Sequence, residues 1–99
     1  MSAEVAKVLR DALVVFGPNG EKWSGLPAQQ ADGMCAWGGI FTAIGYGTLG
    51  APDGQAQIWA GHLGFASSHE LFRWNDAEGR TFAEVKELFE KAIARAEAA

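Results

Sequence analysis

Residues 67–96 have the sequence SSHELFRWNDAEGRTFAEVKELFEKAIARA, and this stretch decides the fold class. Ser67 is followed three residues later by Glu70, and Thr81 is followed at the same spacing by Glu84. This spacing is typical of a capping box, in which the two side chains satisfy backbone N–H groups at the start of a helix. We therefore predict that one helix begins after Ser67 and another begins after Thr81.

The last of these predicted helices has a continuous apolar face. It runs to about residue 96, and its apolar residues recur at the spacing of a buried helix face: Phe82, Val85, Leu88, Phe89, Ala92, Ile93 and Ala96. The helix before it is short and carries Leu71, Phe72 and Trp74. Residues 75–79 lie between the two helices and are turn-forming.

The N-terminal segment predicts a further amphipathic helix. Ser2 is placed to cap it, and Gly17 followed by Pro18 ends it. The apolar stripe of this helix consists of Val5, Val8, Leu9, Ala12, Leu13 and Phe16. Residues 17–33 then form a loop, which we expect Trp23 and Leu26 to anchor to the core.

Residues 33–46 predict a helix with two unlike faces. The bulky face consists of Met34, Trp37, Ile40, Phe41 and Ile44. The opposite face consists of Cys35, Gly38, Gly39 and Thr42, which are small. We expect this helix to be central, with another helix lying close against its small face.

The next segment is expected to form a turn over residues 45–52 and a helix capped by Asp53. The predicted buried face of that helix consists of Ile58, Trp59, His62, Leu63 and Ala66.

Together these patterns predict one all-α domain over residues 1–99, built as a compact bundle of four to five helices. Residues 14–16 and 46–49 are weak strand candidates and leave room for a minor β-hairpin. With 48% hydrophobic residues, including four Trp and six Phe, the chain can bury a core without a disulfide or a structural metal.

The charge balance argues against some classes of partner. The chain has eight Lys and Arg against twelve Asp and Glu, a net charge of −4, and its basic residues are scattered. Such a protein repels phosphate backbones, so we expect no nucleic-acid binding. Because no leader segment and no long apolar run is present, we also expect no membrane insertion and a cytoplasmic location.

Several of these segments occur in an order that resembles a known family. They are the first helix, the Trp23 loop, residues 34–40 (MCAWGGI) and residues 74–81 (WNDAEGRT). The resemblance is to small proteins of unknown function from bacteria and their phages, which carry a W-C-x-x-G-A segment and a W-N-D-x-x-G-R-T turn. It covers roughly residues 8–95. The chain departs from the pattern at Met34, where Trp is usual, and at Gly39, where Ala is usual.

The sequence gives little support for a catalytic or metal-binding function. Cys35 would need His62 or His69 beside it to act as a nucleophile, and we expect it instead to pack as a small hydrophobe. His62 lies on an apolar face and is expected to be a hydrogen-bonded core residue. The histidine and cysteine spacings match no zinc signature, so we assign no catalytic residue, metal or cofactor.

The turn over residues 74–81 holds the candidate binding site. Each of its residues has a local structural role, and we expect Arg80 to pair with Asp76 or Glu84. The same residues can form a polar recognition spot beside an aromatic wall, and this interpretation selects four binding residues: Trp23, Trp74, Asp76 and Arg80.

The leading hypothesis is a small acidic protein-binding or regulatory protein without catalysis, phage-related and acting on a host protein. Its partner is an unidentified protein, and some of Trp23, Trp59 and Trp74 should then be exposed. The alternative is a small enzyme that uses Cys35 or a pair of His with Asp76. A third possibility is a homodimer formed through an exposed helix face.

Overall fold

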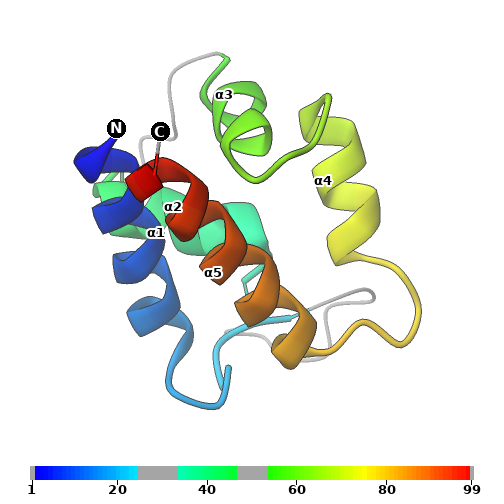
Figure 1. The fold of residues 1–99 in the computed structure, drawn as a ribbon. Coiled ribbons are helices and arrows are strands. Elements are labelled where there is room, and N and C mark those ends of the chain that lie inside the picture. Colours follow the sequence, from blue (N-terminus) through cyan, green and yellow to red (C-terminus); the bar gives the residue numbers. More distant parts are fainter. Residues whose placement is uncertain (1, 25–33, 47–53, 99) are drawn as a thin grey trace.

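In the computed structural model, which describes residues 2–24, 34–46 and 54–98, the chain forms five α-helices and no β-strand over those residues. The all-α prediction is thus confirmed (Figure 1). In chain order the helices are α1 (Ala3–Phe16), α2 (Ala36–Ile44), α3 (Gln55–His62), α4 (Ser68–Asn75) and α5 (Phe82–Ala98).

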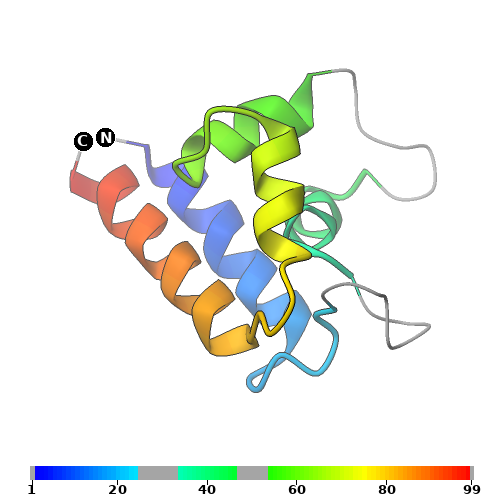
Figure 2. The same cartoon turned by 90° about the vertical axis from the view of Figure 1, so that its right-hand side faces the viewer.

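Helices α1 and α5 lie antiparallel and side by side, so the start of α1 and the end of α5 meet at one end of the bundle (Figures 1 and 2). The Ser2 backbone N–H donates to the Ala96 carbonyl at 2.8 Å, and Arg10 forms an ion pair with Glu97. Helix α2 packs across α1, while α3 and α4 pack against each other and against α2. The core between these helices consists mainly of Leu9, Phe16, Ile40, Trp59, Leu63, Leu71, Val85, Phe89 and Ile93.

The close helix packing predicted for the small face of α2 occurs at Gly39 alone, since Cys35 and Gly38 are half-buried and Thr42 is exposed. Gly39 is buried against the ring of Phe16, so closely that a Cβ atom at Gly39 would lie 2.3 Å from Phe16 Cζ. The Phe16 ring also meets Phe82 and Phe89 edge-on, at centroid distances of 5.8 and 5.7 Å. The central position of α2 follows from this contact with α1.

The helix starts agree with the predicted caps. Ser67 Oγ accepts the Glu70 N–H at 3.2 Å. Thr81 Oγ1 accepts the Glu84 N–H at 3.4 Å, and Glu84 Oε1 accepts the Thr81 N–H at 2.9 Å, which completes a reciprocal capping box. The hydrogen bond from the Thr81 backbone lowers the pKa of the Glu84 carboxyl below its usual 4.5.

Replacing Glu84 with Gln should therefore lower stability in a pH-dependent way. The depressed pKa means that ionised Glu84 stabilises the fold above its unfolded-state pKa of 4.5, and that this contribution is lost as the pH falls through the folded pKa. Denaturant unfolding should show the wild type more stable than Glu84→Gln at about pH 7, with the difference vanishing towards about pH 2. A difference that is constant over this range would contradict a stabilising role for the charge.

The predictions for α2 and α3 need correction. Helix α2 begins at Ala36, later than expected, because the Met34 backbone instead pairs with Lys22 and Ser24. Helix α3 has Gly54 at its N-cap position, and Asp53 lies outside the described residues. Its buried side chains are Trp59, Ala60 and Leu63, whereas Ile58, His62 and Ala66 are exposed. Within α3 the buried side is the one that carries Trp59 and Ala60, so the predicted face is placed too far towards Ile58 and His62. Ala66 lies beyond Gly64, where a φ of +98° turns the chain.

The structure also tests part of the predictions for the two weak strand candidates and for the residues expected to anchor the loop. Residues 14–16 form the last turn of α1 and are not a strand, while residues 47–49 lie outside the described residues. Trp23 packs against the core, as expected of an anchor. Leu26, the other expected anchor, lies outside the described residues.

Candidate functional site

The side chain of Asn75 is the centre of the region that contains the predicted binding residues. Asn75 is 0% exposed, although it is polar. Its Oδ1 atom accepts the Trp23 indole N–H at 2.8 Å and the Ala36 backbone N–H at 3.0 Å. Its Nδ2 atom donates to the Ser24 carbonyl at 3.2 Å and to Asp76 Oδ1 at 3.1 Å. One amide thus joins the end of α4, the Trp23 loop and the start of α2.

The sequence predicts a smaller role for Asn75, limited to the turn amides around it. The long-range role is visible only in the fold, because Trp23 and Ala36 are 52 and 39 residues away along the chain. One signal was present: Asn75 lies four residues after Leu71, which is the spacing of the same helix face, and both residues are buried. A polar residue on an apolar helix face indicates a buried hydrogen-bond partner.

We call the buried Asn75 side chain the asparagine hub. Next to it, the Arg80 guanidinium stacks on the ring of Trp74. Arg80 Cζ lies 4.0 Å from the ring centroid, a cation–π geometry. Arg80 Nε donates to the Trp74 carbonyl at 2.8 Å, and Nη1 donates to Glu84 Oε2 at 3.1 Å. Of the two carboxylates expected to pair with Arg80, Glu84 is the one that does so. Asp76 is turned instead towards Asn75.

Hollows lie on either side of the stacked pair. One has a volume of about 420 Å³ and is lined by Phe65, Glu70, Arg73, Trp74, Ala77 and Arg80. The other has a volume of about 260 Å³ and is lined by Trp74, Arg80, Glu84, Glu87, Leu88 and Lys91. We call this surface the Trp74–Arg80 face. It carries three basic and three acidic side chains, so it is mixed in charge and differs from the acidic chain as a whole.

The structure does not bring all four predicted binding residues to this face. Trp74 and Arg80 line both hollows, whereas Trp23 and Asp76 line neither. The Trp23 ring lies beside Phe82 at a centroid distance of 6.5 Å, and its indole N–H is used by Asn75. Trp23 and Asp76 therefore lie outside the hollows, and the side chains of both are hydrogen-bonded to Asn75.

The tryptophans are less exposed than a large aromatic interaction surface would require. Trp59 is buried, and Trp23, Trp37 and Trp74 are half-buried. Among the described residues, the large hydrophobic side chains that are exposed are Val14, at 79%, and Ile58, at 52%.

Cys35 and His62 occupy positions that differ from a catalytic pair. Cys35 is the N-cap of α2, and its Sγ atom accepts the Gly38 N–H at 3.4 Å. His62 is exposed rather than in the core, because α3 buries the side that carries Trp59 and Ala60, and the His62 and Trp59 ring centroids are 5.0 Å apart. His62 lines a cavity of about 320 Å³ with Ser2, Val5, Ala92, Arg95 and Ala96, and Cys35 is not part of that lining.

Within residues 2–24, 34–46 and 54–98, no group of three or more His, Cys, Asp or Glu side chains is placed to hold a metal ion. Over the same part of the chain, every helix is too short or too polar to cross a membrane.

The fold and the site define a small all-α protein with a buried asparagine hub beside a stacked Trp–Arg pair. The chain belongs to a family of unknown function (DUF6197), whose model matches residues 1–95. Membership in a family of unknown function agrees with the resemblance found in the sequence, while the bacterial and phage origin stays a prediction. No curated protein and no solved structure matches the chain.

Proposed function

We propose that this chain is a non-catalytic protein-binding protein and that its contact surface is the Trp74–Arg80 face. The stacked Arg80–Trp74 pair between two hollows is the observation that carries the proposal. Trp and Arg are the side chains most enriched among residues that dominate binding energy at protein interfaces. The partner is a protein in the cytoplasm, and for a phage-encoded chain it is a protein of the host.

The pair is held in place before any partner arrives, which favours binding. Arg80 is fixed by the Trp74 carbonyl and by Glu84, and its side chain is 18% exposed. An arginine that is already ordered loses less conformational entropy on binding than a free one. Within the part of the chain that the structure describes, the hydrogen bonds of Arg80 use Nε and Nη1, so Nη2 can donate to a partner.

Trp23 and Asp76 belong to the same site as positioning residues. Both are hydrogen-bonded to Asn75, which follows Trp74 directly in α4. They hold the end of α4 against the Trp23 loop and the start of α2, and so fix the direction in which Trp74 leaves the helix. On this proposal their loss weakens binding by loosening the face rather than by removing a contact.

Arg73 provides the test, because it lines the larger hollow and has no hydrogen bond or ion pair within the described residues. The tagged wild-type chain should capture one host protein in stoichiometric amount, and Arg73→Glu should reduce the captured amount by about tenfold or more. Lys7→Glu is the matched control. It makes the same change in net charge on an exposed part of α1, remote from the lining of both hollows.

Lys7→Glu should retain the partner, and both variants should keep the wild-type circular dichroism spectrum. Equal loss of the partner in the two variants would indicate a general charge effect and would contradict the proposed surface. Recovery of the tagged chain alone would contradict protein binding itself.

A further inference from the structure

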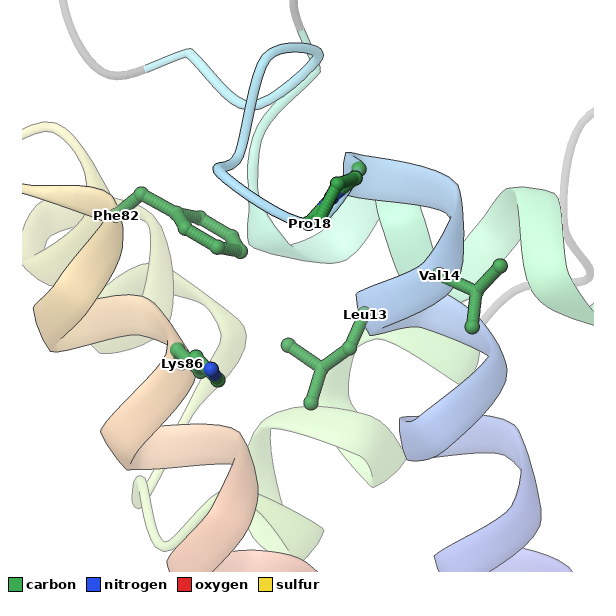
Figure 3. Close-up of a pocket in the computed structure, with 6 residues that line it drawn as sticks. Leu13, Val14, Pro18, Phe82 and Lys86 are labelled. Carbon is green, nitrogen blue, oxygen red and sulfur yellow. The ribbon is translucent and has the colours of Figure 1, made fainter.

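A second surface, separate from the Trp74–Arg80 face, is a hollow of about 350 Å³ between the end of α1 and the start of α5. It is lined by Leu13, Val14, Gly17, Pro18, Phe82 and Lys86. In Figure 3, the Phe82 ring extends from α5 across the gap towards α1, Lys86 lies on the same helix, and Leu13 and Pro18 lie on the facing side. We call this hollow the α1–α5 groove. None of its lining residues also lines the Trp74–Arg80 face.

The apolar wall of the groove is rigid. The Phe82 ring packs edge-on against the buried ring of Phe16 at 5.8 Å and lies 6.5 Å from the ring of Trp23. Gly20 approaches the same ring so closely that a Cβ atom there would lie 2.1 Å from Phe82 Cγ. At the rim, Val14 is 79% exposed, the highest exposure of any large hydrophobic side chain in the described residues. The groove is thus preformed and open to solvent.

The charge that lines the groove is positive, on a chain whose net charge is −4. Lys86 makes no hydrogen bond or ion pair within the described residues. Glu90, one turn later in α5, is exposed and does not line the groove. The Glu21 carboxylate lies beside Gly17 and accepts the Asn19 N–H at 3.1 Å; it is not part of the groove lining and forms no ion pair with Lys86. An ammonium that has no ion pair among the described residues and lies beside an apolar wall favours an apolar group with a carboxylate next to it.

We infer that the α1–α5 groove binds a peptide segment of a partner protein in which an apolar side chain is adjacent to an acidic one. The apolar side chain lies between Leu13 and Phe82, and the carboxylate meets the Lys86 ammonium. A volume of about 350 Å³ lies at the low end of ligand sites, so the groove takes one or two side chains rather than a folded surface. This gives the chain a second contact point that does not depend on Trp74 or Arg80.

The test is an NMR titration of the full-length ¹⁵N-labelled chain with the peptide acetyl-Leu-Glu-Leu-amide. Backbone amide shifts should move at Leu13, Val14, Gly17 and Lys86. The matched peptide acetyl-Leu-Gln-Leu-amide should bind about threefold more weakly at low salt, the size expected of one exposed ion pair. This preference should disappear at about 1 M salt, where exposed charges are screened.

Two lysine variants separate the ion pair from general attraction to acidic peptides. Lys86→Gln should bring the Glu-to-Gln preference to about one, while Lys7→Gln, which removes an exposed lysine that is paired with Asp11 and lies outside both surfaces, should leave the preference intact. Both lysines are exposed, so both variants should keep the wild-type melting temperature.

Three results of the peptide titrations would overturn the inference. They are the absence of shifts at the groove residues, equal binding of the Glu and Gln peptides, and a preference that survives in Lys86→Gln. Concentration-dependent shifts of the same amides without any peptide would show that a second copy of the chain occupies the groove, and would also overturn it. The peptide titration measures shifts at the α1–α5 groove, whereas Arg73→Glu measures partner capture by the Trp74–Arg80 face. Failure of one proposal can therefore be distinguished from failure of the other.

Discussion

Replacing Asn75 with Ala is expected to lower the free energy of unfolding by about 3–4 kcal/mol, a large fraction of the stability of a small domain. The substitution removes both hydrogen bonds that Oδ1 accepts and both that Nδ2 donates. It leaves the backbone N–H of Ala36, which is fully buried, without an acceptor. A buried donor that loses its only partner costs about 1–3 kcal/mol by itself.

Asn19→Ala is the matched control for Asn75→Ala. Asn19 is exposed, and its side chain makes one long hydrogen bond to Glu21 at 3.4 Å. Chemical denaturation should show a change of about 0.5 kcal/mol or less for this variant. The indole N–H resonance of Trp23 should also move in Asn75→Ala, because its acceptor is gone. An equally small loss of unfolding free energy in Asn75→Ala and Asn19→Ala would contradict the role of Asn75 in joining α4, the Trp23 loop and α2.

Replacing Gly39 with Ala should destabilise the fold by about 2 kcal/mol, although Ala is the better helix former by about 1 kcal/mol. The new Cβ atom would lie 2.3 Å from Phe16 Cζ, and the Phe16 ring is held between Phe82 and Phe89. The ring is fully buried and cannot move aside without displacing α5. The steric cost therefore exceeds the gain in helix propensity.

Gly61→Ala is the control for this substitution, since nothing lies within 4 Å of a Cβ atom at Gly61 in α3. Thermal or chemical unfolding should show Gly61→Ala more stable than the wild type by up to about 1 kcal/mol. The two Gly-to-Ala changes should thus have opposite signs. Destabilisation of the same size in both variants would show that the clash with Phe16 is not the cause.

A double variant tests the same contact from the other side. Phe16→Leu shortens the side chain that meets position 39, so Gly39→Ala should cost less in that background, with a coupling of about 1 kcal/mol or more. The coupling would show that a smaller side chain in α1 is sufficient to accommodate Ala at position 39.

The helices could be predicted from the sequence because their signals are local. The Ser67 and Thr81 caps lie within three residues of the amides that they satisfy, and the apolar stripe of α5 recurs every three or four residues. The small face of α2 also predicted its close contact with another helix. It did not identify Phe16 of α1 as the contact, since spacing along one helix carries no information about which helix packs against it.

The candidate site was predicted only in part, because its contacts join distant segments. Trp74 and Arg80 were selected as neighbours within one turn, and they do stack on each other. Asn75 was given a local role, since nothing in the sequence shows that Trp23 and Ala36 reach the end of α4. The core position predicted for His62 is wrong because α3 is short and buries the side that carries Trp59 and Ala60, and an apolar pattern over eight residues does not define which side faces the core.

The claim that the Trp74–Arg80 face contacts a protein partner can be tested most directly by photo-crosslinking in the cells that produce the chain. A photoreactive phenylalanine analogue would be placed at Arg73, which lines the larger hollow, and in a separate variant at Lys7 on α1. We expect one crosslinked host protein from position 73 and none from position 7. The same crosslinked protein from both positions, or from neither, would contradict the account.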